Sequence, residues 1–195
     1  MAVSSVYGIL HTRMADEAFT IRPVNETDKE WITSFLEEHW GSTRFVTRGR
    51  LFFADENPGF FTFEDDKPVG IITYGIIGDE CEITTLNSLA EGKGIGTALI
   101  NAVKDTATQA GCKRLLVITT NDNTHAIRFY QRYGFTIATI YPNSMEEARM
   151  IKPEIPLTGN DGIPLRDEIE FEIYLKTEKE YYHVNRLTPP AYLSV

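Results

Sequence analysis

The sequence predicts one α/β (α+β) domain in which helices pack on a mixed sheet. Its 195 residues are enough for a domain with a full-sized core. A hydrophobic content of 42% and a charged content of 24% are typical of a globular protein. Short apolar runs with the period of a strand alternate with longer segments that have the period of a helix. Such an order indicates helices that cover a sheet.

The N-terminal part of this pattern predicts a strand, a helix and a loop. Residues 19–24 alternate as a short strand, and Thr27 and Glu30 have the spacing of a capping box. The helix that follows carries an apolar face made of Trp31, Ile32, Phe35, Leu36 and Trp40. We expect Trp40 to pack in the core. A glycine is expected to end the helix, and residues 41–49 are expected to form an irregular polar loop.

The middle of the chain predicts three strands in a row and then alternating helices and strands. Turn residues rich in Gly, Pro and Asp separate the expected elements. Strands are expected at residues 60–63, 69–76, 80–86, 115–118 and 135–140. One helix is expected after the glycine segment that begins at Gly92, with a stripe of apolar residues facing inward. A second helix is expected over residues 123–133, with Asn123 as its N-cap and Gly134 as its stop.

The last part of the pattern predicts a short helix, a loop and a strand. Ser144 and Glu147 have the spacing of a capping box, which predicts a helix over residues 143–150. Three prolines mark the stretch up to residue 166 as a loop or lid. Residues 167–175 alternate strictly between apolar and acidic side chains. We expect Ile169, Phe171, Ile173 and Leu175 to face inward, and Glu168, Glu170 and Glu172 to face outward.

Composition narrows the class of protein. A net charge of −9 argues against a nucleic-acid partner and mildly favours a cationic or amine partner. Cys81, Cys112 and the four histidines have no spacing typical of a metal or redox site, so no metal is expected. No apolar stretch is long enough for a membrane span, and the start of the chain does not look like a secretion signal. We therefore expect a cytoplasmic protein without a membrane or nucleic-acid partner.

Three glycines at alternate positions form the most informative segment. Gly92, Gly94 and Gly96 follow an apolar run and open a strongly helix-forming stretch. The start of such a helix presents unpaired N–H groups and the positive end of the helix dipole, which together bind phosphate-like anions. Lys93 lies between the glycines, so the segment is not a P-loop. Its position in mid-chain also does not fit a dinucleotide-binding fingerprint.

Two motifs in this order resemble the GNAT N-acetyltransferases. The first is Gly92-Lys93-Gly94-Ile95-Gly96-Thr97, before the central helix. The second begins with Asn123-Thr124-His125-Ala126, continues with Phe129-Tyr130, and ends with Gly134-Phe135. The resemblance covers about residues 19–175. It implies a mostly antiparallel central sheet of about six to seven strands, an acetyltransferase domain over residues 18–176, an N-terminal extension over residues 1–17 and a C-terminal tail over residues 177–195.

This resemblance implies that acetyl-CoA is the acyl donor and indicates which residues bind it. Backbone N–H groups of Gly92, Lys93, Gly94, Ile95, Gly96 and Thr97 are expected to bind the diphosphate. The end of the fourth strand of the family fold corresponds to Leu86, with Asn87 and Ser88 beside it. A backbone N–H there is expected to stabilise the thioester carbonyl. Asn123 is expected to contact the pantetheine amide, and the small Ala126 to leave room for it. Glu91 stands where the family usually has Arg or Gln, so we expect weaker phosphate contact at that corner.

Catalytic roles follow from the same resemblance. Tyr130 matches the general acid that gives a proton to the departing thiolate, although periodicity alone also fits a packed aromatic side chain. Glu80 and Glu82 alternate on one strand and point to one face, so either is a candidate base, acting through water. Exposure at the edge of the sheet is the other interpretation of these two residues. Solvent can also accept the proton from an amine of low pKa.

The acceptor is expected to be a primary amine of a small molecule or a peptide. Residues 41–49 and 143–166 are its expected walls, and the acidic last strand hints at a basic acceptor. Two alternatives stay open, a transferase for a longer acyl group and a non-catalytic acyl-CoA-binding regulatory module. The tail after Lys176 contains Tyr181, Tyr182 and Tyr192, which could cover its own domain or a second subunit in a homodimer.

Overall fold

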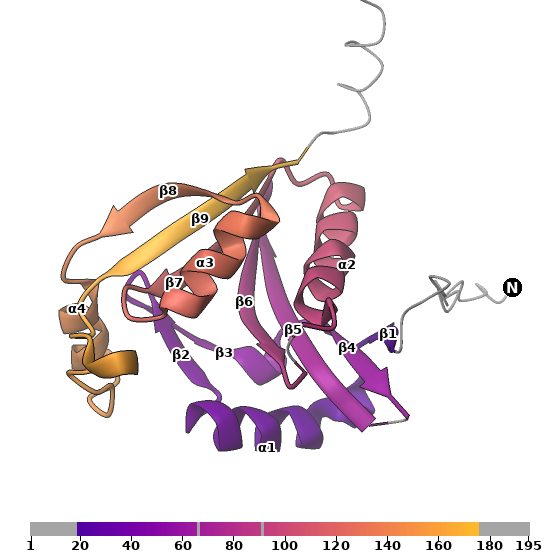
Figure 1. Cartoon of the computed structure of the whole chain (residues 1–195), viewed down its shortest axis with the longest axis horizontal. Coiled ribbons are helices and arrows are strands. Elements are labelled where there is room, and N and C mark those ends of the chain that lie inside the picture. The colour runs from indigo at the N-terminus through magenta and orange to yellow at the C-terminus, as the bar shows by residue number, and fades with distance from the viewer. Residues whose placement is uncertain (1–18, 66, 91, 176–195) are drawn as a thin grey trace, which may run out of the picture.

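The computed structural model, which describes residues 19–65, 67–90 and 92–175, has a seven-stranded sheet at its centre (Figure 1). The order of its strands is β1 (Thr20–Pro23), β4 (Gly59–Glu64), β5 (Lys67–Ile77), β6 (Glu80–Ser88), β7 (Arg114–Thr120), β9 (Glu168–Tyr174) and β8 (Thr136–Tyr141). Only β6 and β7 pair in parallel, and every other neighbouring pair is antiparallel. The predicted mixed, mostly antiparallel sheet is therefore confirmed.

Helices cover both faces of this sheet. The helix α1 (Lys29–Trp40) lies on one face, and α2 (Ile95–Gln109) and α3 (Thr124–Tyr133) lie on the other (Figure 1). A short helix, α4 (Ser144–Ile151), follows β8. The proposed extension, the C-terminal tail with its three tyrosines, and Glu91 lie outside the described residues.

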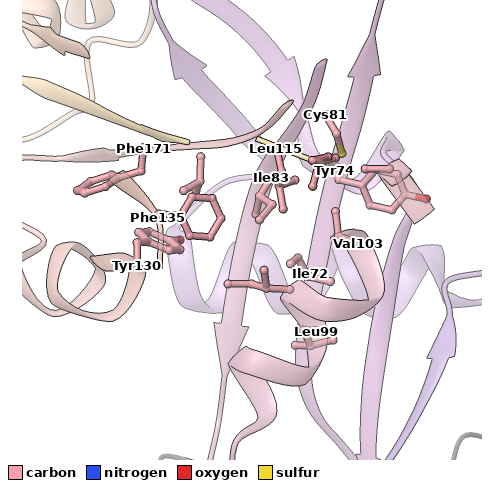
Figure 2. Close-up of a cluster of buried hydrophobic side chains, with 14 of the residues drawn as sticks. Ile72, Tyr74, Cys81, Ile83, Leu99, Val103, Leu115, Tyr130, Phe135 and Phe171 are labelled. Atoms are coloured by element: carbon pink, nitrogen blue, oxygen red, sulfur yellow. The ribbon is translucent and has the colours of Figure 1, made fainter. Parts of the chain in front are cut away.

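The two faces of the sheet have separate apolar cores. Neighbouring residues on β5 show this directly: Ile71 packs with α1 and Ile72 packs with α2, and both are fully buried. Successive side chains of a strand point to opposite faces, so one strand contributes to both cores. The larger core, on the side of α2 and α3, contains Leu99, Val103 and Phe171 (Figure 2). In the described chain, no helix is long and apolar enough to span a membrane.

The cap of α1 differs from the one that the sequence predicts. The side chain of Asn25 accepts a hydrogen bond from the N–H of Thr27 at 2.9 Å, and Asp28 accepts one from the N–H of Asn25 at 2.9 Å. The capping box is therefore Asn25–Asp28, and it opens a short 3₁₀ turn before α1. The prediction of Thr27 as N-cap is wrong, because Asn25 already provides the cap two residues earlier. Gly41 ends α1 at φ 70°, as predicted.

Residues 41–49 do not form the predicted irregular loop. Strands β2 (Arg44–Thr47) and β3 (Arg50–Phe53) form a hairpin, joined by Arg48 and Gly49 at φ 48° and 68°. Two positive φ angles in a two-residue connection suit the right-handed twist of a hairpin, and glycine favours such a turn. The alternation of apolar and polar side chains in this segment is short, and three arginines obscure it. The hairpin packs beside the central sheet near the end of α1 (Figure 1).

The orientation of β9 corrects a second prediction. Phe171 and Leu175 are buried, as expected, but Glu168 and Glu170 are also only 3% exposed each. The prediction that these carboxylates face outward is wrong, because Arg48 of the hairpin turn lies against this face of β9 and donates hydrogen bonds to Glu168 and Glu170. A strict alternation shows which residues share a face, but it does not show that one face is in water.

The C-terminal helix and loop complete the fold. Asn143, at φ 61°, is the N-cap of α4, and the buried hydroxyl of Ser144 has no hydrogen-bond partner among the described residues, so the predicted capping box is absent. The predicted loop after α4 is present. It is held against the start of α3 by Asp122, whose carboxylate accepts two hydrogen bonds of 2.8 Å from Asn160.

Candidate active site

The parallel pairing of β6 and β7 stops halfway along the two strands. It covers four residue pairs, from Glu80 and Arg114 to Ile83 and Val117. Beyond this point β6 continues to pair with β5, and β7 continues to pair with β9. Thr84 is an extra residue in β6, because Thr73 and Tyr74 of β5 pair with Thr85 and Ile83. A bulge of this kind bends a strand, and this one lies where β6 separates from β7.

A cavity of about 150 Å³ lies at this split in the sheet. Three consecutive residues of each strand border it: Glu82, Ile83 and Thr84 of β6, and Ile118, Thr119 and Thr120 of β7. Consecutive residues point to opposite faces of a sheet, so a cavity that touches all of them passes between the strands. The hairpin, Trp40, Asn123 and Glu168 close its remaining sides. We call it the split cavity.

The N-terminus of α2 begins with the predicted glycine segment. Gly92 and Gly94 have φ of 75° and 78°, in the left-handed region that favours glycine. Gly94 is the N-cap and makes no side-chain cap, and no side chain of the described residues bonds the first N–H groups of α2. Gly96 has a different role, since a Cβ there would lie 3.0 Å from the ring of Phe129 on α3. The glycines therefore shape the helix start and bring α2 close to α3.

A larger groove of about 890 Å³ runs between α2 and α3. Thr97, in the first turn of α2, borders it, so the groove begins at the uncapped helix end. Its basic side chains are Lys104, His125, Arg128 and Arg132. An uncapped helix N-terminus beside such a groove suits a ligand with several phosphate groups.

The other residues predicted to bind the cofactor lie on both sides of the split. Leu86 is half-buried against the core of α2 and α3. The Oδ1 of Asn87 accepts a hydrogen bond of 2.9 Å from the indole of Trp40, and the hydroxyl of Ser88 bonds the carbonyl of Ala90. Asn123 borders the split cavity, and its side chain caps α3 through the N–H of Ala126, as predicted.

Lys93 is engaged within the protein. Its ammonium contacts both carboxylate oxygens of Glu64 on β4, at 2.6 and 2.8 Å. The pair is exposed and therefore weak, so it does not prevent the backbone of the glycine segment from binding an anion.

Tyr130 lies inside the core, on the inner face of α3. It is 7% exposed, and its ring contacts the rings of Phe129, Phe135 and Phe171 (Figure 2). Burial raises the pKa of its hydroxyl well above the ordinary value, so the group stays protonated at neutral pH. Among the described residues that border the two cavities, Tyr130 is absent. The structure thus shows the packed aromatic that periodicity suggests, on the helix that begins at the split cavity.

Glu82 borders the split cavity and forms an ion pair with Arg48 of the hairpin turn. Burial raises the pKa of the Glu82 carboxyl, Arg48 lowers it, and the negative charges of Glu170 and Glu168 raise it further. The net shift is upward. A carboxylate with a raised pKa is a better proton acceptor than an ordinary one.

Glu80 is placed differently from Glu82. It shares the same face of β6 but lies at the fully paired end of the strand, where it accepts a 2.8 Å hydrogen bond from Arg114. Arg114 also binds Glu170 and Glu172. Of the two predicted bases, only Glu82 borders the split cavity.

Three residues of this site do not follow from the sequence alone. Glu168 and Arg48 meet where the N–H of Arg48 donates to Glu168 at 3.1 Å, across 120 positions of sequence. Trp40 is 45% exposed and borders the split cavity, so the prediction that it packs in the core is wrong. The one available signal is the negative charge of Glu168 on a strictly alternating strand. That pattern predicts an exposed side chain, whereas Glu168 is buried.

Comparison with known proteins assigns the family. Residues 24–135 match the family described as "Acetyltransferase (GNAT) family", and this match covers more than half of the chain. The chain belongs to the GNAT acetyltransferase family. It is 46% identical to the uncharacterized protein YdhI of Bacillus subtilis over 152 residues, which are 77% of this chain and 95% of that protein.

Solved structures agree on the fold of this GNAT protein. The IAA acetyltransferase from Bacillus cereus has a TM-score of 0.62 at 22% identity, over 80% of this chain and 99% of that one. A GNAT family acetyltransferase from Elizabethkingia anophelis, solved with acetyl-CoA bound, has a TM-score of 0.58 at 18% identity, over 82% and 100%. These similarities support the assignment of the fold.

Proposed function

We propose that this GNAT protein is an acetyl-CoA-dependent N-acetyltransferase that acts on a primary amine by direct attack. One observation carries the proposal: the sheet opens between β6 and β7 at a cavity bordered by Glu82, while an uncapped helix N-terminus begins nearby at Gly94. Family membership and the acetyl-CoA in a structure of the same fold support the choice of donor.

The residues of this chain suit the parts of acetyl-CoA. The N–H groups of residues 92–97 and the basic groove between α2 and α3 fit its phosphates. The facing edges of β6 and β7, which lose their mutual pairing beyond Ile83 and Val117, fit an arm that carries amide groups. Bound there, acetyl-CoA would supply an acyl group that is activated as a thioester. The domain boundaries at residues 18 and 176 remain part of the proposal.

Two side chains are proposed to move protons. Glu82 accepts a proton from the ammonium form of the acceptor, directly or through water. A backbone N–H near Leu86 stabilises the charge that develops on the carbonyl oxygen. One C–N bond forms and one C–S bond breaks. Tyr130 donates a proton to the departing thiolate. The ammonium loses two protons in the reaction: one replaces the proton that Tyr130 gives away, and the other passes through Glu82 to solvent.

Calorimetry and a thiol-release assay together test the proposal. The purified chain is titrated with acetyl-CoA and then supplied with a panel of primary amines, while free thiol is measured. We expect saturable binding and amine-dependent thiol release, with the acetylated amine seen by mass spectrometry. Acetyl-CoA that binds without turnover on any amine would favour a non-catalytic regulatory module. Faster release from hexanoyl-CoA than from acetyl-CoA would favour a longer acyl group.

A further inference from the structure

The split cavity has walls of two chemical kinds. Trp40, Phe45 and Phe52 border it with aromatic side chains, and Glu82 and Glu168 border it with carboxylates. No Lys or Arg is among the described residues that border it. In other proteins a cavity of this volume holds a group the size of benzene.

Glu168 is the group in this wall that lacks a full set of partners. It is deeply buried, since only 3% of its surface is exposed. Its Oε2 accepts the backbone N–H of Arg48, and its other oxygen has no hydrogen-bond donor among the described residues. This second oxygen is not among the fully buried oxygens without a partner, so it keeps some exposed surface that a cation or a donor can reach. The buried hydroxyl of Thr47, also on this wall, likewise has no partner in the described chain.

The charges around Glu168 do not balance. The cluster linked by hydrogen bonds contains five carboxylates, Glu80, Glu82, Glu168, Glu170 and Glu172, and two guanidinium groups, Arg48 and Arg114. Arg114 is taken by Glu80, Glu170 and Glu172, and the guanidinium of Arg48 by Glu82 and Glu170. Neither guanidinium contacts Glu168, so its charge is left for a ligand.

We infer that the split cavity takes a small primary amine with an apolar or aromatic body, held by Glu168 through its ammonium group, and excludes amines with a carboxylate beside the nitrogen. The inference rests on the proposed function and names the acceptor class for it. The site would recognise two parts of the acceptor. The aromatic rings bind its apolar body, and the carboxylate of Glu168 binds its ammonium group. A carboxylate on the acceptor would be repelled by Glu82 and Glu168 together.

Phenethylamine and phenylalanine are matched probes, since they differ only in the carboxylate. With saturating acetyl-CoA, we expect the kcat/KM of the amine to exceed that of the amino acid by about 100-fold. Glu168→Gln is expected to raise the KM for phenethylamine about ten- to hundredfold, which is the usual effect of losing a buried charge-assisted hydrogen bond. It should leave the KM for acetyl-CoA within about twofold and should not weaken the use of phenylalanine, because the repulsion is reduced.

Glu172→Gln is the matched control. Glu172 lies on the same strand and the same face, but its carboxylate is bound by Arg114 and does not border the split cavity. The Glu172→Gln variant should leave the KM for phenethylamine and the KM for acetyl-CoA unchanged. The inference is overturned if phenylalanine is used as well as phenethylamine, or if Glu168→Gln impairs both acceptors equally. If no amine is acetylated, the transferase proposal fails. In that case both probes are titrated into the CoA-saturated protein. Tighter binding of phenethylamine than of phenylalanine supports the inference, and equal binding overturns it.

Discussion

Arg48 and Glu82 form an ion pair beside the split in the sheet, and this pair affects the pKa of the proposed proton acceptor, Glu82. Burial raises the pKa of Glu82, and Arg48 opposes that rise. A base must be unprotonated to act, so activity should increase with pH through the raised pKa of Glu82. The guanidinium therefore keeps more of the carboxylate in its working form at a given pH.

Replacement of Arg48 by Gln should move the acidic limb of the kcat/KM profile to higher pH. Removing a nearby cation disfavours the carboxylate form of Glu82, so its pKa rises further. Glu82→Gln should abolish this limb. The measurement is kcat/KM against pH, repeated with a fluorinated amine of lower pKa. A limb that shifts with the pKa of the amine belongs to the acceptor, and would contradict the role of Glu82.

Tyr130→Phe should lower kcat by about 100-fold, at the low end of the usual contribution of a general acid. The affinity for acetyl-CoA should stay the same, because the ring keeps its contacts with Phe135 and Phe171. Stopped-flow thiol release and calorimetry measure the two quantities. Tyr74→Phe is the matched control, since Tyr74 is a buried tyrosine of the same core on β5 (Figure 2). Full activity of the Tyr130 variant would refute its role as acid.

The start of α2 is an element whose backbone conformation should matter for the proposed binding of CoA. Gly94→Ala places a Cβ at φ 78°, which should cost about 1–2 kcal/mol in the free energy of unfolding. The same strain should tilt the first N–H groups and weaken the binding of CoA. Urea denaturation and calorimetry test this prediction. Gly75→Ala is the control, because its φ is not positive and a methyl group at this position would have no neighbour within 4 Å. Equal losses of CoA affinity in the Gly94 and Gly75 variants would argue against a specific role for the start of α2.

Most elements could be predicted because their signals are local. Helix periodicity, turn glycines and the cap of Asn123 act within a few residues, and α3 begins and ends where they predict. The hairpin could not be recognised as easily, since it depends on a two-residue turn at Arg48 and Gly49 inside a polar-looking segment. The predicted cap of α1 is two residues too late because Asn25 and Thr27 are both good caps.

The donor and acceptor sides of the site differ in how far the sequence predicts them. Most of the residues proposed to bind the donor lie in two contiguous motifs, so a resemblance finds them. The acceptor side depends on a contact between Arg48 and Glu168, 120 positions apart, and no local pattern contains it. The sequence pattern places Glu168 in solvent because alternation does not reveal that the hairpin turn at Arg48 lies against this face of β9.

At the scale of the whole molecule, the sheet is joined across β6 and β7 by only four residue pairs. The N–H groups of residues 84–88 and 118–120 that face the split lack a partner strand there. Binding of CoA should therefore slow amide hydrogen exchange in these two segments more than elsewhere. Exchange measured by mass spectrometry with and without CoA tests this, with residues 59–64 of β4 as the internal reference. Slower exchange in the β2–β3 hairpin alone would contradict the proposed placement of CoA between β6 and β7.

The hairpin of β2 and β3 supplies Phe45 and Phe52 to the border of the split cavity and pairs Arg48 with Glu82, while the glycine segment stands at the start of α2. The two features come from separate stretches of sequence. Exchanges within residues 44–53 would therefore be expected to alter the proposed amine preference without changing the glycine segment that is proposed to bind the donor's phosphates. Part of the proposed acceptor preference can accordingly be changed through one ten-residue segment.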